Sequence, residues 1–153
     1  TGLVVIDNIV QAKGFSKEEL YLNAKLWIAS SFKSSNDVIQ LDDKDNGIII
    51  VKGRFTFAPN GDAGFFTDFD DCYFTLKIYC KEERFRVFWT DFEFDFAQNG
   101  NSISAENSFL YPYEADGLTP NYYRSRNKEA CLAMIDKYNY NLKKTLTSKL
   151  EEW

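Results

Sequence analysis

Residues 72–96, which read CYFTLKIYCKEERFRVFWTDFEFDF, decide the fold of this chain. Apolar side chains occupy every second position in the first half, and the alternation resumes after the dipeptide Glu82-Glu83. That period is typical of a β-strand with one buried face, so the stretch predicts two antiparallel strands joined by a tight turn. Phe92 has the opposite parity to Trp89. We therefore expect a β-bulge near Thr90-Asp91 that returns the later phenylalanines to the core.

The segment before this hairpin predicts three strands and one helix. The strands are indicated by apolar, β-branched runs at residues 3–10, 38–41 and 48–57. Ser16 and Glu19 have the spacing of a capping box, which predicts the start of a helix that ends near residues 34–36. Residues 42–47 form a polar turn with Asn-Gly at its end, and this pair favours a hairpin between the second and third runs.

The segment after the hairpin predicts an irregular stretch and then a second helix. Residues 97–123 show no clear period. From about Asn127 apolar side chains recur at helical spacing to the end of the chain: Cys131, Met134, Ile135, Tyr138, Leu142, Leu146, Leu150 and Trp153. We expect Trp27 from the first helix and Trp89 from the hairpin to lie in the core.

These elements predict one α+β domain over residues 1–153. Strands joined by short turns are antiparallel neighbours. Because each helix has one apolar stripe, both are expected on the same face of the sheet, in a two-layer sandwich with the order β-α-β-β-β-β-α. The other face of the sheet is then open to water or to a partner.

Composition limits the classes of function. The chain has 153 residues, of which 44% are hydrophobic and 17% aromatic, and this is enough for a folded core. Its net charge of -5 argues against a nucleic-acid binder, which needs a basic face. The longest apolar run, Ile48 to Val51, is far too short to span a membrane. The chain begins at Thr1 without an initiator Met, so we expect that upstream residues were removed.

The sequence offers little for catalysis or metal binding, so we predict no catalytic residue, cofactor or metal. It contains no His, and its three cysteines are sparse and odd in number, so we expect unpaired, buried thiols. Residues 42–47 lack the spacing of a calcium loop. A hydrolase acting on glycans remains an alternative, because two suitable carboxylates suffice for such chemistry. Its candidates are Asp68, Asp70, Asp71, Asp91, Glu93 and Asp95.

One family resembles this chain in several of these segments. They are the helix run from Gly14 to Tyr21, the Asp45-Asn46-Gly47-Ile48 turn, and the hairpin with Phe74-Thr75-Leu76 and Arg86-Val87-Phe88. The family is a bacterial domain of unknown function with a TATA-binding-protein-like (TBP-like) fold. The resemblance implies a TBP-like α+β domain and an exported protein of Gram-negative bacteria, in the periplasm or associated with the cell envelope. It implies no activity, and a shared fold name does not transfer DNA binding.

We therefore expect a non-enzymatic binding module of the cell envelope that uses the open sheet face or the 97–123 loop. Strand parity assigns eight residues to that face: Arg54, Thr56, Tyr73, Thr75, Lys77, Tyr79, Arg86 and Phe88. Such a mixture of aromatic and cationic side chains is favoured at protein interfaces, although exposed aromatics also occur on solvated sheets.

Tyr111 and Tyr113 in the loop are candidates for lining a groove, or else they anchor the loop. The partner is expected to be an unknown protein or glycan. A self-associating structural subunit, including a homodimer, is the alternative within this class.

Overall fold

The alternating stretch forms the centre of the sheet. In the computed structural model, which describes residues 4–32, 38–56, 71–96, 101–104 and 122–149, it folds into β4 (Asp71–Lys81) and β5 (Arg84–Phe96). Glu82 and Glu83 make the turn between them, and Glu83 has a φ of +57°. The predicted hairpin is confirmed.

The predicted bulge is also confirmed. Asp91 has a φ of +53°, a value that L-residues rarely adopt in a strand. Trp89 and Thr90 are both buried, and burial then continues at Phe92 and Phe94 with the parity shifted by one. The extra residue at Asp91 therefore changes which positions of β5 face the core.

β1 (Ile6–Gln11) pairs antiparallel with the first part of β5, from Ile6 opposite Trp89 to Gln11 opposite Arg84. The sequence predicted this strand at 3–10, which starts too early. The ladder begins at Ile6, which lies opposite Trp89, two residues before the bulge at Asp91. Beyond the bulge, the last residues of β5 pair with β6 (Asn101–Ser104), a strand that the sequence did not predict.

β2 (Ile39–Asp43) and β3 (Ile48–Thr56) form the second hairpin, as predicted. Gly47, with a φ of +68°, provides the left-handed backbone of its turn. The strands follow the order β1-β5-β4-β3-β2, and β6 is attached to β5.

Two helices complete the described part of the chain. α1 (Lys17–Ser31) begins with the predicted capping box: the Ser16 side chain accepts from the Glu19 N–H, and the Glu19 side chain accepts from the Ser16 N–H. α4 (Tyr122–Leu146) starts earlier than the predicted Asn127. No helix in the described residues is both long enough and apolar enough to cross a membrane.

The chain divides into two compact units. The first contains Thr1–Val5, Arg54–Phe74 and Thr90–Asp136, and the second contains Ile6–Gly53, Thr75–Trp89 and Lys137–Trp153. Strands β3, β4 and β5 and helix α4 each contribute residues to both units. The sequence-based assignment of one domain over residues 1–153 stays a prediction.

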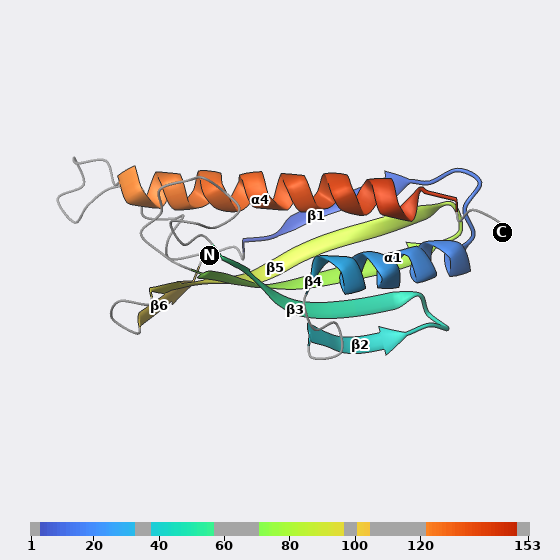
Figure 1. Cartoon of the computed structure of the whole chain (residues 1–153), viewed down its shortest axis with the longest axis horizontal. Helices are drawn as coiled ribbons and strands as arrows, with labels where there is room; N and C mark the ends of the chain where they lie inside the picture. The colour runs from blue at the N-terminus through green and yellow to red at the C-terminus, as the bar shows by residue number, and fades with distance from the viewer. Residues whose placement is uncertain (1–3, 33–37, 57–70, 97–100, 105–121, 150–153) are drawn as a thin grey trace. The chain divides into compact units, whose positions relative to one another are not determined.

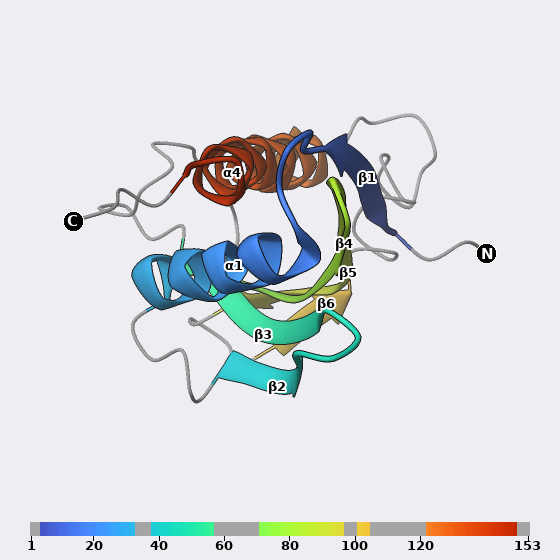
Figure 2. The same cartoon turned by 90° about the vertical axis from the view of Figure 1, so that its right-hand side faces the viewer.

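In the second unit, α1 and the end of α4 lie on the same face of the strands (Figures 1 and 2). The core between the layers contains Trp27 and Trp89, which are 2% and 0% exposed. The Tyr138 ring meets both indoles edge to face, with centroids 6.0 and 6.3 Å away. The predicted core positions of both tryptophans, and the predicted α+β sandwich with helices on one face, are confirmed.

The core of the first unit contains an aromatic pair and two thiols. The rings of Phe55 and Phe74 stack with centroids 4.4 Å apart. Cys72 and Cys131 are buried and free, as is Cys80 in the second unit, so the prediction of unpaired, buried cysteines is confirmed. A hydrogen bond with Cys131, together with burial, raises the pKa of Cys72 well above its usual range. The Cys72 thiol is therefore held in its protonated form.

Candidate functional site

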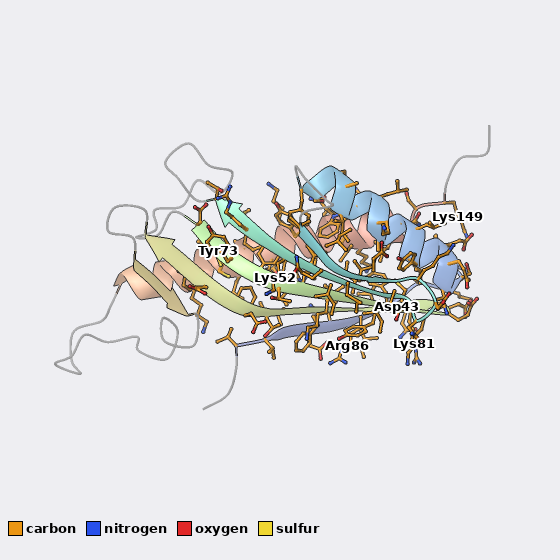
Figure 3. All side chains as sticks on the ribbon, turned by 90° about the horizontal axis from the view of Figure 1, so that it is seen from below. Asp43, Lys52, Tyr73, Lys81, Arg86 and Lys149 are labelled. Carbon is orange, nitrogen blue, oxygen red and sulfur yellow. The ribbon has the colours of Figure 1, made fainter. Side chains whose placement is uncertain are left out.

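The open face of the second unit is the surface of its strands that carries no helix among the described residues. It is defined by the positions that alternate with the core positions Val51, Ile78 and Val87. Its side chains are Asp7, Ile9 and Gln11 from β1, Leu41 and Asp43 from β2, Ile48, Ile50 and Lys52 from β3, Lys77, Tyr79 and Lys81 from β4, and Arg84, Arg86 and Phe88 from β5. Figure 3 looks onto this face, with Lys52, Lys81 and Arg86 labelled.

Arg86 is the centre of a cation–aromatic cluster on this face. Its guanidinium carbon lies 5.8 Å from the centroid of the Tyr79 ring and 5.4 Å from that of the Phe88 ring. The Lys77 ammonium lies 5.8 Å from the Phe88 centroid. These distances are within the range of cation–π attraction. The structure thus brings together three predicted site residues, Tyr79, Arg86 and Phe88.

Asp7 holds the guanidinium of Arg86 in place. Arg86 Nε donates to Asp7 Oδ1 at 2.8 Å, and Nη2 donates to Oδ2 at 2.6 Å. In the β1–β5 register Asp7 lies opposite Phe88, so the pair is diagonal, within reach of a long side chain. These hydrogen bonds lower the pKa of the Asp7 carboxyl and raise the pKa of Arg86, so both groups stay charged.

Sequence reasoning missed Asp7 and two exposed apolar side chains of the open face, Ile9 beside the cluster and Leu41 on β2, the edge strand farthest from β1. Ile9 is 67% exposed, the highest value among the large exposed hydrophobic side chains of the described residues, and it lies opposite Arg86 in the register. Leu41 on β2 is 42% exposed. Asp7 and Ile9 reach the cluster through the pairing of β1 with β5. Local periodicity in the sequence does not reveal that pairing.

Two other predicted residues, Arg54 and Tyr73, belong to the first unit. Arg54 Nη1 lies 4.0 Å from Asp71 Oδ2, and Thr56 Oγ1 donates to Asp71 Oδ1 at 2.9 Å. Tyr73 is 41% exposed, in agreement with its predicted position. Tyr111 and Tyr113 lie outside the described residues.

Thr75 was assigned to the open face by strand parity, and only 5% of it is exposed. A threonine side chain is short, and longer neighbours on a sheet cover it easily.

The described carboxylates that could serve the alternative enzyme function are either exposed to solvent or already bound by neighbouring side chains. Asp91 and Glu93 are exposed, and Asp71 is engaged by Arg54 and Thr56. Asp68, Asp70 and the side chain of Asp95 lie outside the described residues. Within the described ranges, no three His, Cys, Asp or Glu side chains gather to hold a metal ion.

Residues 7–95, more than half of the chain, match the family described as a domain of unknown function (DUF4468) with a TBP-like fold. The chain belongs to this DUF4468 family. Among solved structures, it is similar to a TBP-like protein from Parabacteroides distasonis, with 14% identity, a TM-score of 0.74, and coverage of 97% of this chain and 95% of that one.

A DUF4468 family protein from Bacteroides ovatus is similar too, with 15% identity and a TM-score of 0.71. The alignment covers 99% of this chain and 90% of that protein. At such identities the likeness establishes the fold alone. No curated protein matches the sequence. The family and fold expected from the resemblance are therefore confirmed.

Proposed function

We propose that this DUF4468 protein is a non-enzymatic interaction module of the bacterial cell envelope, and that the open face binds its partner. The observation that carries the proposal is the fixed cluster of Arg86, Tyr79 and Phe88, held by Asp7 on a face that no described helix covers. A few residues supply most of the binding energy at protein interfaces, and Arg and Tyr are enriched among them.

The cluster is suited to binding because it is ordered before a partner arrives. Two hydrogen bonds fix the Arg86 guanidinium, and the rings beside it have few rotatable bonds. A surface that is already ordered loses less conformational entropy on association. The exposed side chains of Ile9 and Leu41 add apolar area on the same face.

The envelope location rests on the resemblance to exported proteins of Gram-negative bacteria. The non-enzymatic assignment rests on the absence of histidine from the sequence and on the exposed carboxylates described above. Cell fractionation tests the location: the protein is expected in the periplasmic or envelope fraction, and recovery with the cytosol contradicts it.

The binding role is tested by a pull-down from envelope extract with three baits. They are the wild type, the double variant Tyr79→Ala/Phe88→Ala, and a control, Lys137→Ala/Lys143→Ala, which changes exposed side chains on α4. We expect the wild type and the control to retain a common partner, and the face variant to lose it while it remains folded by circular dichroism.

Two results oppose the proposal. If the face variant unfolds, then Tyr79 and Phe88 belong to a second core. If all three baits retain the same partner, the binding surface lies elsewhere. Recovery of the protein itself as the partner would favour the self-associating subunit over a hetero-complex.

A further inference from the structure

The open face carries three exposed cations that no described side chain pairs with. They are Lys52 on β3, Lys81 on β4 and Arg84 on β5, all exposed. Within the described residues, each of them has neither a side-chain hydrogen bond nor an ion pair, and Figure 3 shows Lys52 and Lys81 on the face that also bears Arg86. An exposed, unpaired cation keeps its full capacity to bind an anion.

The carboxylates on and next to this face are already engaged. Asp7 binds Arg86, and Asp43 accepts from the backbone and side-chain nitrogens of Asn46 at 3.1 and 2.8 Å. In the adjoining turn, the Glu83 carboxylate accepts a hydrogen bond from the Gly14 N–H at 2.9 Å. The Glu82 carboxylate accepts one from the Lys17 N–H at 3.2 Å. Hydrogen bonds from neutral N–H groups leave these carboxylates charged. The face itself carries five cations, Lys52, Lys77, Lys81, Arg84 and Arg86, against two carboxylates, Asp7 and Asp43, so it is locally cationic although the chain as a whole has a net charge of -5.

We propose that the partner presents an acidic, partly apolar protein segment to this face, an inference that rests on the proposed function. Carboxylates would pair with Lys52, Lys81 and Arg84, and apolar side chains would cover Ile9 and Leu41. Complementary charge of this kind selects partners and accelerates their encounter.

A short acidic segment fits these observations better than an extended polyanion does. Exposed charges more than about 8 Å apart are largely screened at physiological salt, so a short segment responds mainly to the local cations. A nucleic acid or a membrane surface extends past the face and meets the remaining, acidic charge of the chain. A glycan would stack on open ring faces, whereas Arg86 and Lys77 already occupy the Phe88 ring.

The test uses a fluorescein-labelled random copolymer of Glu and Tyr, with polyglutamate as a probe of charge alone. Binding is measured by fluorescence anisotropy for the wild type, for Lys81→Glu/Arg84→Glu, and for Lys137→Glu/Lys143→Glu. The last variant has the same change in net charge but places it on α4. We expect the copolymer to bind the wild type and the α4 variant, and to bind the face variant at least about tenfold more weakly.

Specific results overturn the inference. They are no binding of the copolymer to the wild type, equal weakening in both variants, or binding of phosphatidylglycerol vesicles or duplex DNA in place of the copolymer. Stronger binding of polyglutamate than of the copolymer would show that the partner segment binds through its charge alone and would overturn the proposed apolar contacts with Ile9 and Leu41. If Lys81→Glu/Arg84→Glu fails to fold, Lys52→Glu and Lys143→Glu make the same comparison. A copolymer that does not bind, beside a pull-down that still depends on Tyr79 and Phe88, would overturn only the acidic partner and leave the proposed function intact.

Discussion

An added methyl group at Gly47 should disturb the second unit more than one at Gly14. Its φ is +68°, and a Cβ built there would lie 2.5 Å from the carbonyl oxygen of Cys80. That oxygen belongs to the backbone of β4, and the Cys80 N–H donates to Gly47 O at 2.7 Å. The two backbones therefore cannot separate without losing this hydrogen bond.

The expected cost of Gly47→Ala follows from these contacts. Left-handed backbone costs a residue with a Cβ about 1–2 kcal/mol, and loss of the hydrogen bond adds about 0.5–1.5 kcal/mol. The free energy of unfolding should therefore fall by about 1.5–3.5 kcal/mol. Urea unfolding followed by far-UV circular dichroism measures it.

Gly14→Ala is the matched control for this prediction. Gly14 also has a positive φ, +84°, but a Cβ added there would meet nothing within 4 Å. The control therefore keeps the backbone cost and lacks the contact with β4. Equal destabilisation by the two variants would refute the reasoning from the Cys80 contact, and wild-type stability of Gly47→Ala would refute the turn geometry as well.

Three further predictions concern the core, the thiols and the ion pair. Trp89→Ala should lower the free energy of unfolding by about 3–5 kcal/mol, measured in the same way, because it empties a fully buried site. All three cysteines should titrate after denaturation without reductant but react slowly in the native protein, where burial raises the pKa of Cys80 to about 12. Asp7→Asn should destabilise the protein at neutral pH, and this difference should shrink below about pH 4.

The pH dependence has this sign because the pKa of Asp7 is lowered in the folded state. Its contribution to stability is complete above the pKa of the unfolded chain and disappears as pH falls through the lower, folded value. A difference that persists in strong acid would show that Asp7 acts without its charge.

A loss of stability below about 0.5 kcal/mol for Trp89→Ala would place that side chain at the surface. Fewer than three thiols titrated after denaturation would reveal a disulfide.

The parts of the fold that depend on local pattern were predictable. The alternation in β4 and β5 and the capping box of α1 are set by neighbouring residues, and the shift in parity between Trp89 and Phe92 indicated the bulge. The bounds of β1 and the existence of β6 were not predictable, because both depend on which stretches of β5 are available for pairing. A strand as short as Asn101–Ser104 has too few residues to show a period.

The candidate site was predictable only in its central part. Tyr79, Arg86 and Phe88 come from adjacent strands of one hairpin, so parity alone placed them on the same face. Asp7 is 79 residues from Arg86 in the sequence, and their contact requires the pairing of β1 with β5. The cationic character of the face also emerged only when the strand pairing showed which charged side chains share it.

Site-specific photocrosslinking in native cells tests the central claim, that the open face is the binding surface, most directly. A benzophenone side chain would replace Phe88 in one variant and Lys143, exposed on α4, in a matched control. We predict a discrete crosslinked product, larger than the protein alone, from position 88 and none of that size from position 143. No product from position 88, or the same product from both positions, would contradict the claim.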